Sequence, residues 1–379
     1  MLFIISCSKE PETTATVEVI DGVEHIHNIA TPLYPSKTVT FEEELSIGGE
    51  DEERNILIYQ PRSFLVDEDE MIYIVDGQDQ VIKVFDSTGS LLRSFGAKGE
   101  GPGEFQSIGY FSFLPDGRLL VMDSRARRTS LFDQHGDFIS SHQWTKSLSQ
   151  AHLTTNSSYI IQEYTFEDGD NPLSERILLI NEYDFEGNEV RSYGEFTPPK
   201  FNTHSEKNIT VGVRVPHARQ SVFAGDLKRQ QLYHCLSSTY LIEVFDMTGK
   251  IVRKIDRPYE PLPFTSGDKD EFLARYENSR NERMKKIVQS IVFPSVKSVV
   301  QRMIVDDEGR LWVVTSEQKE EDEVTFTSYD IFNSDGHYEA KVWIDKPPSY
   351  FLKGKMYRMH TDEDSGYRYL KRYRVIWSE

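Results

Sequence analysis

The stretch Val84-Phe85-Asp86-Ser87-Thr88-Gly89 decides the fold, because it ends an apolar strand and begins a tight turn. An Asp side chain caps such a turn and a Gly supplies the positive φ that it needs, so the pattern predicts a β-hairpin. Four further copies are Leu131-Phe132-Asp133-Gln134-His135-Gly136, Glu182-Tyr183-Asp184-Phe185-Glu186-Gly187, Val244-Phe245-Asp246-Met247-Thr248-Gly249 and Ile331-Phe332-Asn333-Ser334-Asp335-Gly336. Five predicted hairpins with the same sequence pattern indicate an internal repeat.

Each copy belongs to a longer unit. Upstream lies a second pair of predicted strands, seen most clearly in the segments 65–75, 113–122 and 304–314. A unit therefore holds four short strands, a to d, in about 45 residues, which is the period of a β-propeller blade. The aromatic residue before the turn recurs after 47, 51, 62 and 87 residues. The growing spacing indicates insertions into a constant frame.

The two ends of the chain together supply one more blade. Three strands are expected near the C-terminus, over residues 349–352, 355–360 and 367–376, without a fourth. The segment Thr38–Ile47 alternates apolar and acidic residues and is predicted to be the missing strand. Pairing the first and last strands closes the ring and removes exposed edges. We therefore expect an all-β fold over residues 37–377, a six-bladed β-propeller with four-stranded blades.

The composition is consistent with a packed core, and it argues against a nucleic-acid partner and against a disulfide framework. Apolar residues make up 38% of the 379 and aromatic residues 12%, which is enough for a packed core, and the net charge is −19. Such a charge repels phosphate backbones, so no nucleic-acid partner is expected. Two cysteines cannot form a disulfide framework, and Cys235 lies in an apolar run where a buried thiol is expected.

The first seven residues resemble the end of a lipoprotein signal peptide. Ile4 lies three positions before Cys7 and Ser6 directly before it, as in a lipobox. The resemblance implies lipidation of Cys7 and attachment to the bacterial outer membrane, with residues 8–36 as tether and N-terminal extension. The start Ser8-Lys9-Glu10 is similar to signals that send some lipoproteins to the cell surface, so the periplasmic and surface sides both stay open. The alternative is a chance cysteine in a cytosolic protein.

The first two repeats resemble a known family. The segment 85–105, with its Phe-Asp, Gly and Gly-Glu-Gly-Pro-Gly-Glu-Phe elements, is similar to the NHL repeat and to bacterial six-bladed propeller lipoproteins of the NHL-like or TolB-like kind. The resemblance covers roughly residues 37–377 and is degenerate in the third, fourth and sixth units. It implies a fold and a location, and that family has no settled activity.

The two faces of the expected propeller differ. The a–b and c–d turns are tight, whereas every long insertion joins b to c (165–175 and 316–323) or d to a (194–219 and 257–297). Loops that grow on one face usually mark a binding face, although that face could also merely tolerate insertion.

The largest insertion is predicted to contain one helix within about 265–293. Asp268 and Glu271 suit its N-terminal cap, and Pro294 ends it. Its apolar positions are Phe272, Tyr276, Met284, Ile287, Val288 and Ile291. Such a stripe needs a packing partner, most simply across the mouth of the tunnel, as a lid or as a structural brace.

No catalytic, cofactor or metal motif is complete in the sequence. The run Gly99–Gly103 lacks the Lys-Ser/Thr of a phosphate loop and is expected to be a structural turn. His25 and His27 lack a third ligand, and the acidic runs 168–171 and 362–366 lack the distal Glu of a calcium loop. Neither Gly-x-Ser-x-Gly nor His-Glu-x-x-His occurs.

The remaining candidates are polar residues at the tunnel mouth. Aligning the units places Arg62, Gln150, Arg219 and Gln301 at the entry of innermost strands, and Asp76 and Asp123 at the end of strand b. Such a ring could hold a small ligand, or its members could satisfy one another and buried water. The preferred hypothesis is a non-catalytic envelope protein that binds a glycan, a peptide or a membrane-complex component. The rival is a metal-dependent hydrolase or lyase with its site in the central tunnel.

Overall fold

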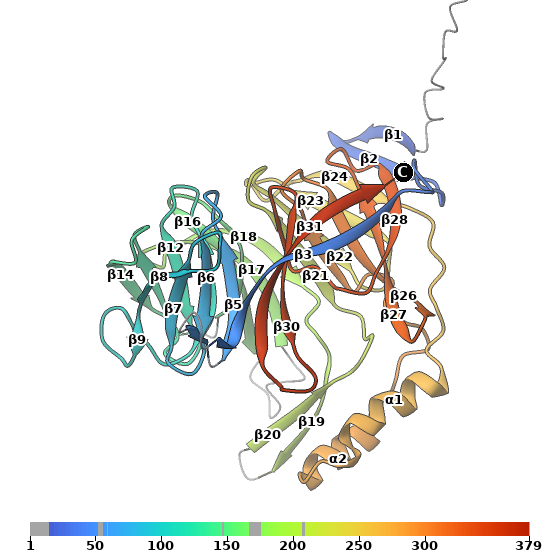
Figure 1. Cartoon of the computed structure of the whole chain (residues 1–379). Coiled ribbons are helices and arrows are strands. Elements are labelled where there is room, and N and C mark those ends of the chain that lie inside the picture. Colours follow the sequence, from blue (N-terminus) through green and yellow to red (C-terminus); the bar gives the residue numbers. More distant parts are fainter. Residues whose placement is uncertain are drawn as a thin grey trace, which may run out of the picture.

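The computed structural model describes residues 15–51, 56–58, 60–145, 148–166, 176–206 and 209–378, and it is a six-bladed β-propeller (Figure 1). Blade 1 consists of β5 (Pro61–Val66), β6 (Ile72–Asp76), β7 (Val81–Phe85) and β8 (Leu91–Phe95). Blade 2 consists of β11 (Ile108–Phe113), β12 (Leu119–Asp123), β13 (Arg128–Phe132) and β14 (Phe138–Gln143). Blade 3 consists of β15 (Leu148–Thr154), β16 (Ser158–Phe166), β17 (Arg176–Asp184) and β18 (Glu189–Phe196). Blades 4 and 5 consist of β21 (Ser221–Asp226), β22 (Gln231–Leu236), β23 (Leu241–Phe245) and β24 (Ile251–Asp256), and of β25 (Arg302–Val305), β26 (Leu311–Glu321), β27 (Val324–Phe332) and β28 (Tyr338–Ile344).

Blade 6 closes the ring as predicted. It consists of β29 (Tyr350–Leu352), β30 (Lys355–Thr361), β31 (Arg368–Ser378) and, from the N-terminal part of the chain, β3 (Thr38–Asp51). The strand β3 pairs antiparallel with β31 from Thr38 opposite Ser378 to Gly48 opposite Tyr369. Its end continues into a short ladder with β4 (Ile56–Ile58). The outermost strand of blade 6 therefore joins the two ends of the propeller.

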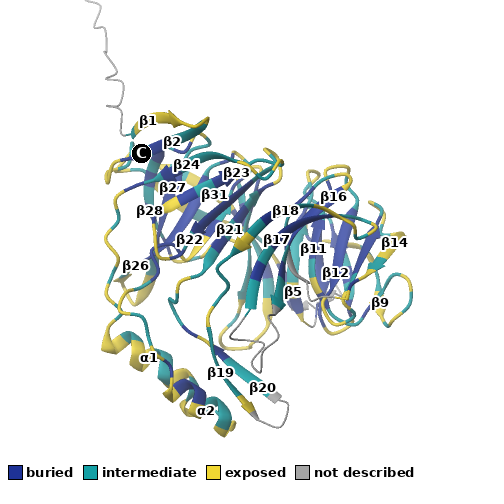
Figure 2. Cartoon of the chain, turned by 180° about the vertical axis from the view of Figure 1, so that it is seen from behind, coloured by how far each residue is buried: buried dark blue, intermediate teal, exposed yellow. Residues whose placement is uncertain are grey.

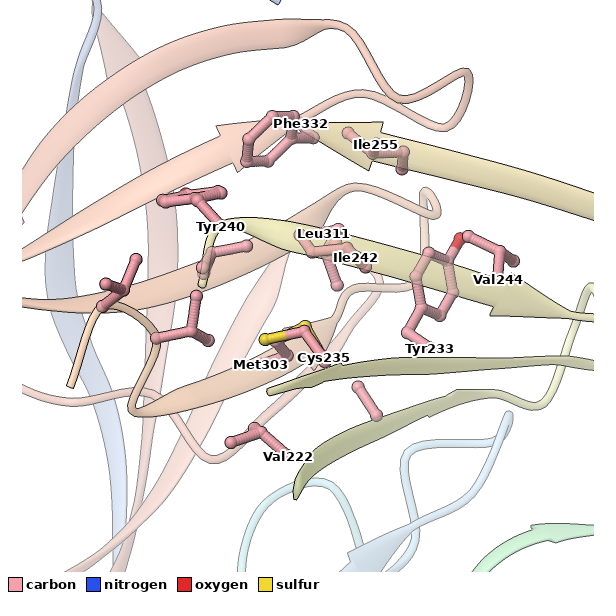
Figure 3. Packing of buried hydrophobic residues seen from close by; sticks show 14 of the residues in the cluster. Val222, Tyr233, Cys235, Tyr240, Ile242, Val244, Ile255, Met303, Leu311 and Phe332 are labelled. Atoms are coloured by element: carbon pink, nitrogen blue, oxygen red, sulfur yellow. The ribbon is translucent and has the colours of Figure 1, made fainter. Parts of the chain in front are cut away.

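The hydrophobic core lies between the blades. Six clusters of buried side chains each join two neighbouring blades, so that every blade packs on both neighbours. Figure 2 shows this burial along the strands, and Figure 3 shows the cluster between blades 4 and 5, in which Cys235 packs beside Met303. Cys235 is a buried free thiol, as expected, and burial raises its pKa to about 12.

The predicted c–d turns are present and also join the blades. In the first, Asp86 accepts hydrogen bonds from the backbone N–H groups of Thr88 and Ser90, at 2.9 Å each. In the second, Gly136 has φ 91°, and a Cβ there would lie 2.6 Å from the Phe95 ring of the preceding blade. Glycine is therefore required at this turn both by its conformation and by the packing of the neighbouring blade.

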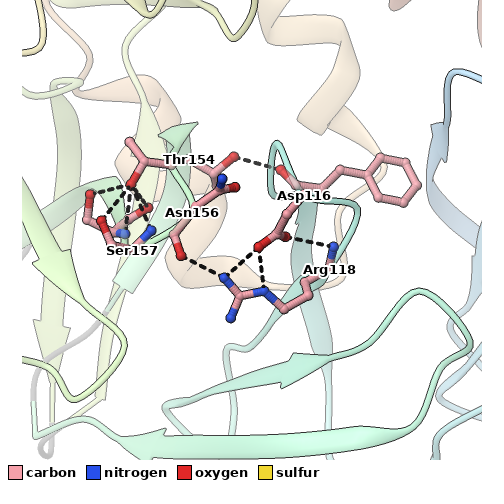
Figure 4. Close-up of polar contacts among 8 residues, drawn as sticks. Asp116, Arg118, Thr154, Asn156 and Ser157 are labelled. Atoms are coloured by element: carbon pink, nitrogen blue, oxygen red, sulfur yellow. Dashed lines mark hydrogen bonds and ion pairs between the residues drawn. The ribbon is translucent and has the colours of Figure 1, made fainter.

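The a–b turns, which lie on the same face as the c–d turns, also fasten neighbouring blades, as Figure 4 shows for blades 2 and 3. Arg118 donates to the carbonyl of Asn156 at 2.6 Å, and Thr154 donates to the carbonyl of Phe113 at 2.6 Å. Arg118 is itself held by Asp116 at 2.9 Å. We call the face with the a–b and c–d turns the turn face, and the opposite face the insertion face.

An N-terminal hairpin extends blade 4 outward, and the strand expected around His25 and His27 is its second strand. β1 (Ala15–Ile20) pairs with β2 (Val23–Asn28), and β2 runs parallel to β24, giving a sheet of six strands. Within the described residues, no helix is long and apolar enough to cross a membrane.

The helical insertion differs from the prediction of one helix. It holds two, α1 (Ser266–Glu277) and α2 (Glu282–Gln289), and Thr265 rather than Asp268 is the N-cap of the first. Asp268 occupies the third helical position and completes the capping box with Thr265. The chain breaks between the helices because Asn278 ends α1 and the side chain of Asn281 caps α2.

Candidate functional site

The insertion face carries the longest excursions of the chain. Between blades 3 and 4 the chain forms the hairpin β19 (Phe201–Glu206) and β20 (Ile209–Arg214), and between blades 4 and 5 it forms α1 and α2. The expected insertion 316–323 is a simple lengthening of β26 and β27, with Asp322 and Glu323 in the turn. Of the expected insertion 165–175, residues 167–175 lie outside the described part of the chain.

The Gly99–Gly103 run is a structural turn, as expected, between the short parallel strands β9 (Ala97–Lys98) and β10 (Glu104–Phe105).

The hairpin and the helices form one unit, although 51 residues separate β20 from α1. A seventh apolar cluster joins them, with Val213, Val215, Ile287, Val288 and Ile291 buried at its centre. Asn202 on the hairpin donates to the carbonyl of Ile287 at 2.8 Å and to the hydroxyl of Ser290 at 2.9 Å. We call residues 200–219 and 264–297 the arm. The apolar stripe predicted on the helix therefore packs on this hairpin, and the expectation that it lies across the tunnel mouth was wrong.

The arm projects from the insertion face and has a compact base (Figures 1 and 2). Lys297 lies 2.6 Å from Asp268, and the rings of Phe264 and Phe293 stack at 5.5 Å. Burial alone would raise the pKa of Asp268, but bonds from Lys297 and Thr265 lower it to about 2. The base therefore holds a carboxylate at all physiological pH values.

A polar relay ties the base of the hairpin to blade 4. The Nε2 atom of His234 lies 3.0 Å from Ser221 Oγ, and its Nδ1 atom lies 3.2 Å from Glu243, whose pKa the histidine lowers. These residue types also form catalytic relays, but Ser221 Oγ here accepts the backbone N–H of Thr197 at 3.1 Å. The rings of Phe196 and Phe223 pack on His234 at 4.8 and 5.1 Å. The relay therefore fastens the chain where it leaves blade 3 for the arm.

Arg62 occupies a bulge at the entry of β5. The register with β6 shifts between Pro61 and Ser63, and a bulge of this kind redirects a side chain at the rim of a sheet. The exposed Arg62 side chain passes over Gly77, where a Cβ would lie 2.2 Å from its Nε atom. Its guanidinium reaches the hydroxyl of Ser107 in blade 2 at 3.5 Å. Arg62 thus spans the rim between blades 1 and 2.

Asp76 and Asp123 are buried and bonded to groups of their own blades. Asp76 accepts N–H groups of Gln60 at 3.2 Å and Gln78 at 3.1 Å, and it pairs with the Lys83 ammonium at 2.8 Å. Asp123 accepts four N–H groups, from Gln106, Ser107, Arg125 and Ala126, at 2.6 to 3.1 Å. Each carboxylate therefore joins the b–c turn to the entry of the innermost strand. Arg62 and Asp123 meet at Ser107, next to a small hollow lined by Gly109, Tyr110, Arg127 and Arg128.

The other predicted residues lie elsewhere on the insertion face. Gln301 donates to the hydroxyl of Ser316 at 2.9 Å, next to the return of the arm into blade 5. Arg219 is exposed at the end of the arm hairpin. Gln150 pairs with Gln162 in the ladder of blade 3, and its side chain and all of Cys7 lie outside the described part of the chain. The five candidates whose side chains are described therefore do not form one ring of contacting groups.

In the described ranges, no group of three or more His, Cys, Asp or Glu side chains is arranged to hold a metal ion.

The signal that could have revealed the arm was the alternation in Ile209-Thr210-Val211-Gly212-Val213-Arg214-Val215, which predicts a strand with one apolar face. That face needed a partner, and the apolar stripe of the helical insertion was available.

Comparisons with known proteins agree on the fold. The family model DUF5128, described as a 6-bladed beta-propeller, matches residues 55–210, and no curated protein matches the chain. A solved structure of a member of the duf4221 family from Bacteroides vulgatus is similar, with 11% identity, TM-score 0.55, and coverage of 90% of this chain and 99% of that one. A Bacteroides fragilis protein (11% identity, TM-score 0.48, coverage 94% and 100%) and virginiamycin B lyase from Staphylococcus aureus (9%, 0.42, 89% and 99%) are also similar. At 11% identity the likeness to the Bacteroides vulgatus structure shows the fold alone, and the matching family model describes that fold as a six-bladed β-propeller.

Proposed function

We propose that the chain is a non-catalytic, lipid-anchored protein of the bacterial outer membrane that binds a partner through its insertion face. The partner classes are a glycan, a peptide or a component of a membrane complex. The observation that carries the proposal is the arm, in which two insertions from different blade connections fold into one unit on that face.

The packing of the arm favours binding over bracing. The arm has its own apolar cluster, and its helices pack on the hairpin β19–β20. The six clusters between the blades draw on blade strands and on residues adjoining them, such as Val299 and Val300 beside blade 5. A brace would share its core with the blades that it supports. A unit with a separate core can bind or move without loosening the propeller.

The charge of the arm indicates what kind of partner it suits. The arm carries eleven Lys and Arg against six Asp and Glu, a net charge of +5, whereas the whole chain carries −19. Lys286 and Arg280 are exposed on this basic unit. Opposite charge steers the approach of a partner and excludes wrong ones. An acidic peptide, protein or glycan is therefore the partner that the arm fits best.

Replacing residues 201–214 and 266–291 with short Gly/Ser linkers tests the proposal. We expect the melting of the propeller to stay nearly unchanged and partner binding in envelope fractions to be lost. Retained binding would place the site elsewhere, and collapse of the propeller would make the arm a brace. Metal analysis of the purified protein tests the rival, because a stoichiometric metal would favour an enzyme with a tunnel site.

The anchor has a separate test. With a complete signal sequence in front, Cys7→Ala should move the protein from the membrane fraction to the soluble fraction. Unchanged membrane association would remove the anchor from the proposal and leave the binding face untouched.

A further inference from the structure

The first strand of the N-terminal hairpin has exposed apolar side chains and an unpaired outer edge. Val17 and Val19 are 49% and 70% exposed and project from the same face of β1, and Ile20 at the turn is 44% exposed. In the described structure β1 pairs only with β2, so its outer edge is unpaired. Exposed apolar strand edges invite association, and proteins usually protect them with charge or cover them. We therefore expect another molecule or surface to cover the apolar side chains of this strand.

The hairpin is firmly fixed to the propeller. Glu24 lies 2.6 Å from Arg253, and His27 lies 2.7 Å from Asp256 on β24. The Asn28 side chain donates to the carbonyl of Gly336 in blade 5 at 3.0 Å. The edge of β1 consequently has a set orientation relative to the blades.

The length of chain before the hairpin identifies the occupant. Seven residues separate Cys7 from Ala15, so the two Cα atoms cannot lie further apart than about 28 Å even in a fully extended chain. A lipid on Cys7 would therefore hold β1 close to the bilayer. Figures 1 and 2 place the β1–β2 hairpin and the arm at opposite ends of the molecule. The arm would then point away from the membrane.

We propose that Val17 and Val19 rest on the phospholipid surface as a second contact beside the lipid, and that this contact directs the arm outward. The inference builds on the anchor in the proposed function. Glu18, Asp21 and Glu24 lie in the same hairpin, so a zwitterionic surface suits it better than an anionic one.

The test does not depend on whether cells attach the lipid. Cys7 is coupled in vitro to a maleimide lipid in phosphatidylcholine vesicles with brominated acyl chains. Cys235 does not compete, because it is 1% exposed and its pKa is about 12. A tryptophan is introduced by Val19→Trp, with Val292→Trp in the arm, where the native side chain is 81% exposed, as the matched control.

We expect strong quenching of the reporter at position 19 and none at position 292. Val17→Asp together with Val19→Asp, in the uncoupled chain, should lower partition onto phosphatidylcholine vesicles about tenfold, whereas Val190→Asp on β18 should not. Equal quenching at both positions would overturn the proposal. So would concentration-dependent shielding of position 19 without vesicles, because the occupant would then be a second copy of the chain.

Discussion

Replacing Arg257 with methionine should strongly destabilise the propeller. Arg257 and Asp330 form a buried ion pair at 2.7 Å, with side chains 6% and 0% exposed. Tyr240 and Tyr338 donate their hydroxyls to the same carboxylate at 2.7 and 2.8 Å, and both rings stack on the guanidinium. Burial alone would lower the pKa of Arg257, but the charge of Asp330 raises it.

The size of the effect follows from the charge left behind. Removing one member of a buried ion pair costs about 3–5 kcal/mol, because the other charge stays in a poorly solvated site. We expect Arg257→Met to lower the free energy of unfolding by about that amount. Adding Asp330→Asn should restore much of the loss because it removes the buried negative charge. Its amide oxygen can accept from one tyrosine hydroxyl, and its NH2 group can donate to the oxygen of the other.

Urea unfolding followed by tryptophan fluorescence measures these differences. Arg280→Met on the exposed part of the arm is the matched control and should change stability by less than about 0.5 kcal/mol. The reasoning fails if Arg257→Met costs no more than this control. It also fails if the double variant is as unstable as a simple sum of two losses.

Three further predictions concern the N-terminal part and the arm. Deleting residues 1–14 removes none of the described strands and should leave a soluble propeller, whereas deleting 1–51 removes β3, exposes the edge of β31 and should cause aggregation in light scattering; equal behaviour would contradict closure through β3. The hydrogen bond that His27 donates to Glu18 and the charge of Asp256 raise the pKa of His27. The contribution of this contact to stability is therefore full below about pH 6.5 and disappears as the pH rises through the folded pKa. Glu18→Gln should lower this pKa in an NMR titration, and an unmoved value would refute the contact. Thr265→Ala removes the N-cap of α1, worth about 1 kcal/mol, and should speed amide exchange in α1 but not in β21; parallel changes in both would show that arm and blade unfold together.

The blades could be predicted because their signals are local. An aromatic residue, an Asx and a Gly at fixed spacing are sufficient for a turn such as 85–89, and the turn determines the register of its two strands. Closure through Thr38–Ile47 could also be predicted, since a propeller with three C-terminal strands leaves one edge to be filled. Both predictions required only the number of predicted strands and the alternation of apolar and polar residues along them.

The arm and the buried networks depend on contacts between distant segments. The residue pattern of Ile209–Arg214 shows an apolar face but does not identify α2 as its packing partner, and the pattern of α2 does not identify the hairpin. The pairing of β2 with β24 is parallel and joins residues more than 200 positions apart. Asp76 and Asp123 were placed correctly at the ends of their strands, but their backbone partners depend on turn geometry that residue types alone do not fix.

Photo-crosslinking in intact cells tests the central claim that the insertion face binds a partner. A photoreactive residue replaces Lys286 on the arm, and a matched one replaces Gln134, which is exposed on the turn face. We predict a discrete adduct with one partner from position 286 and none from position 134. Adducts from position 134 alone, or equally from both positions, would contradict a binding site on the insertion face.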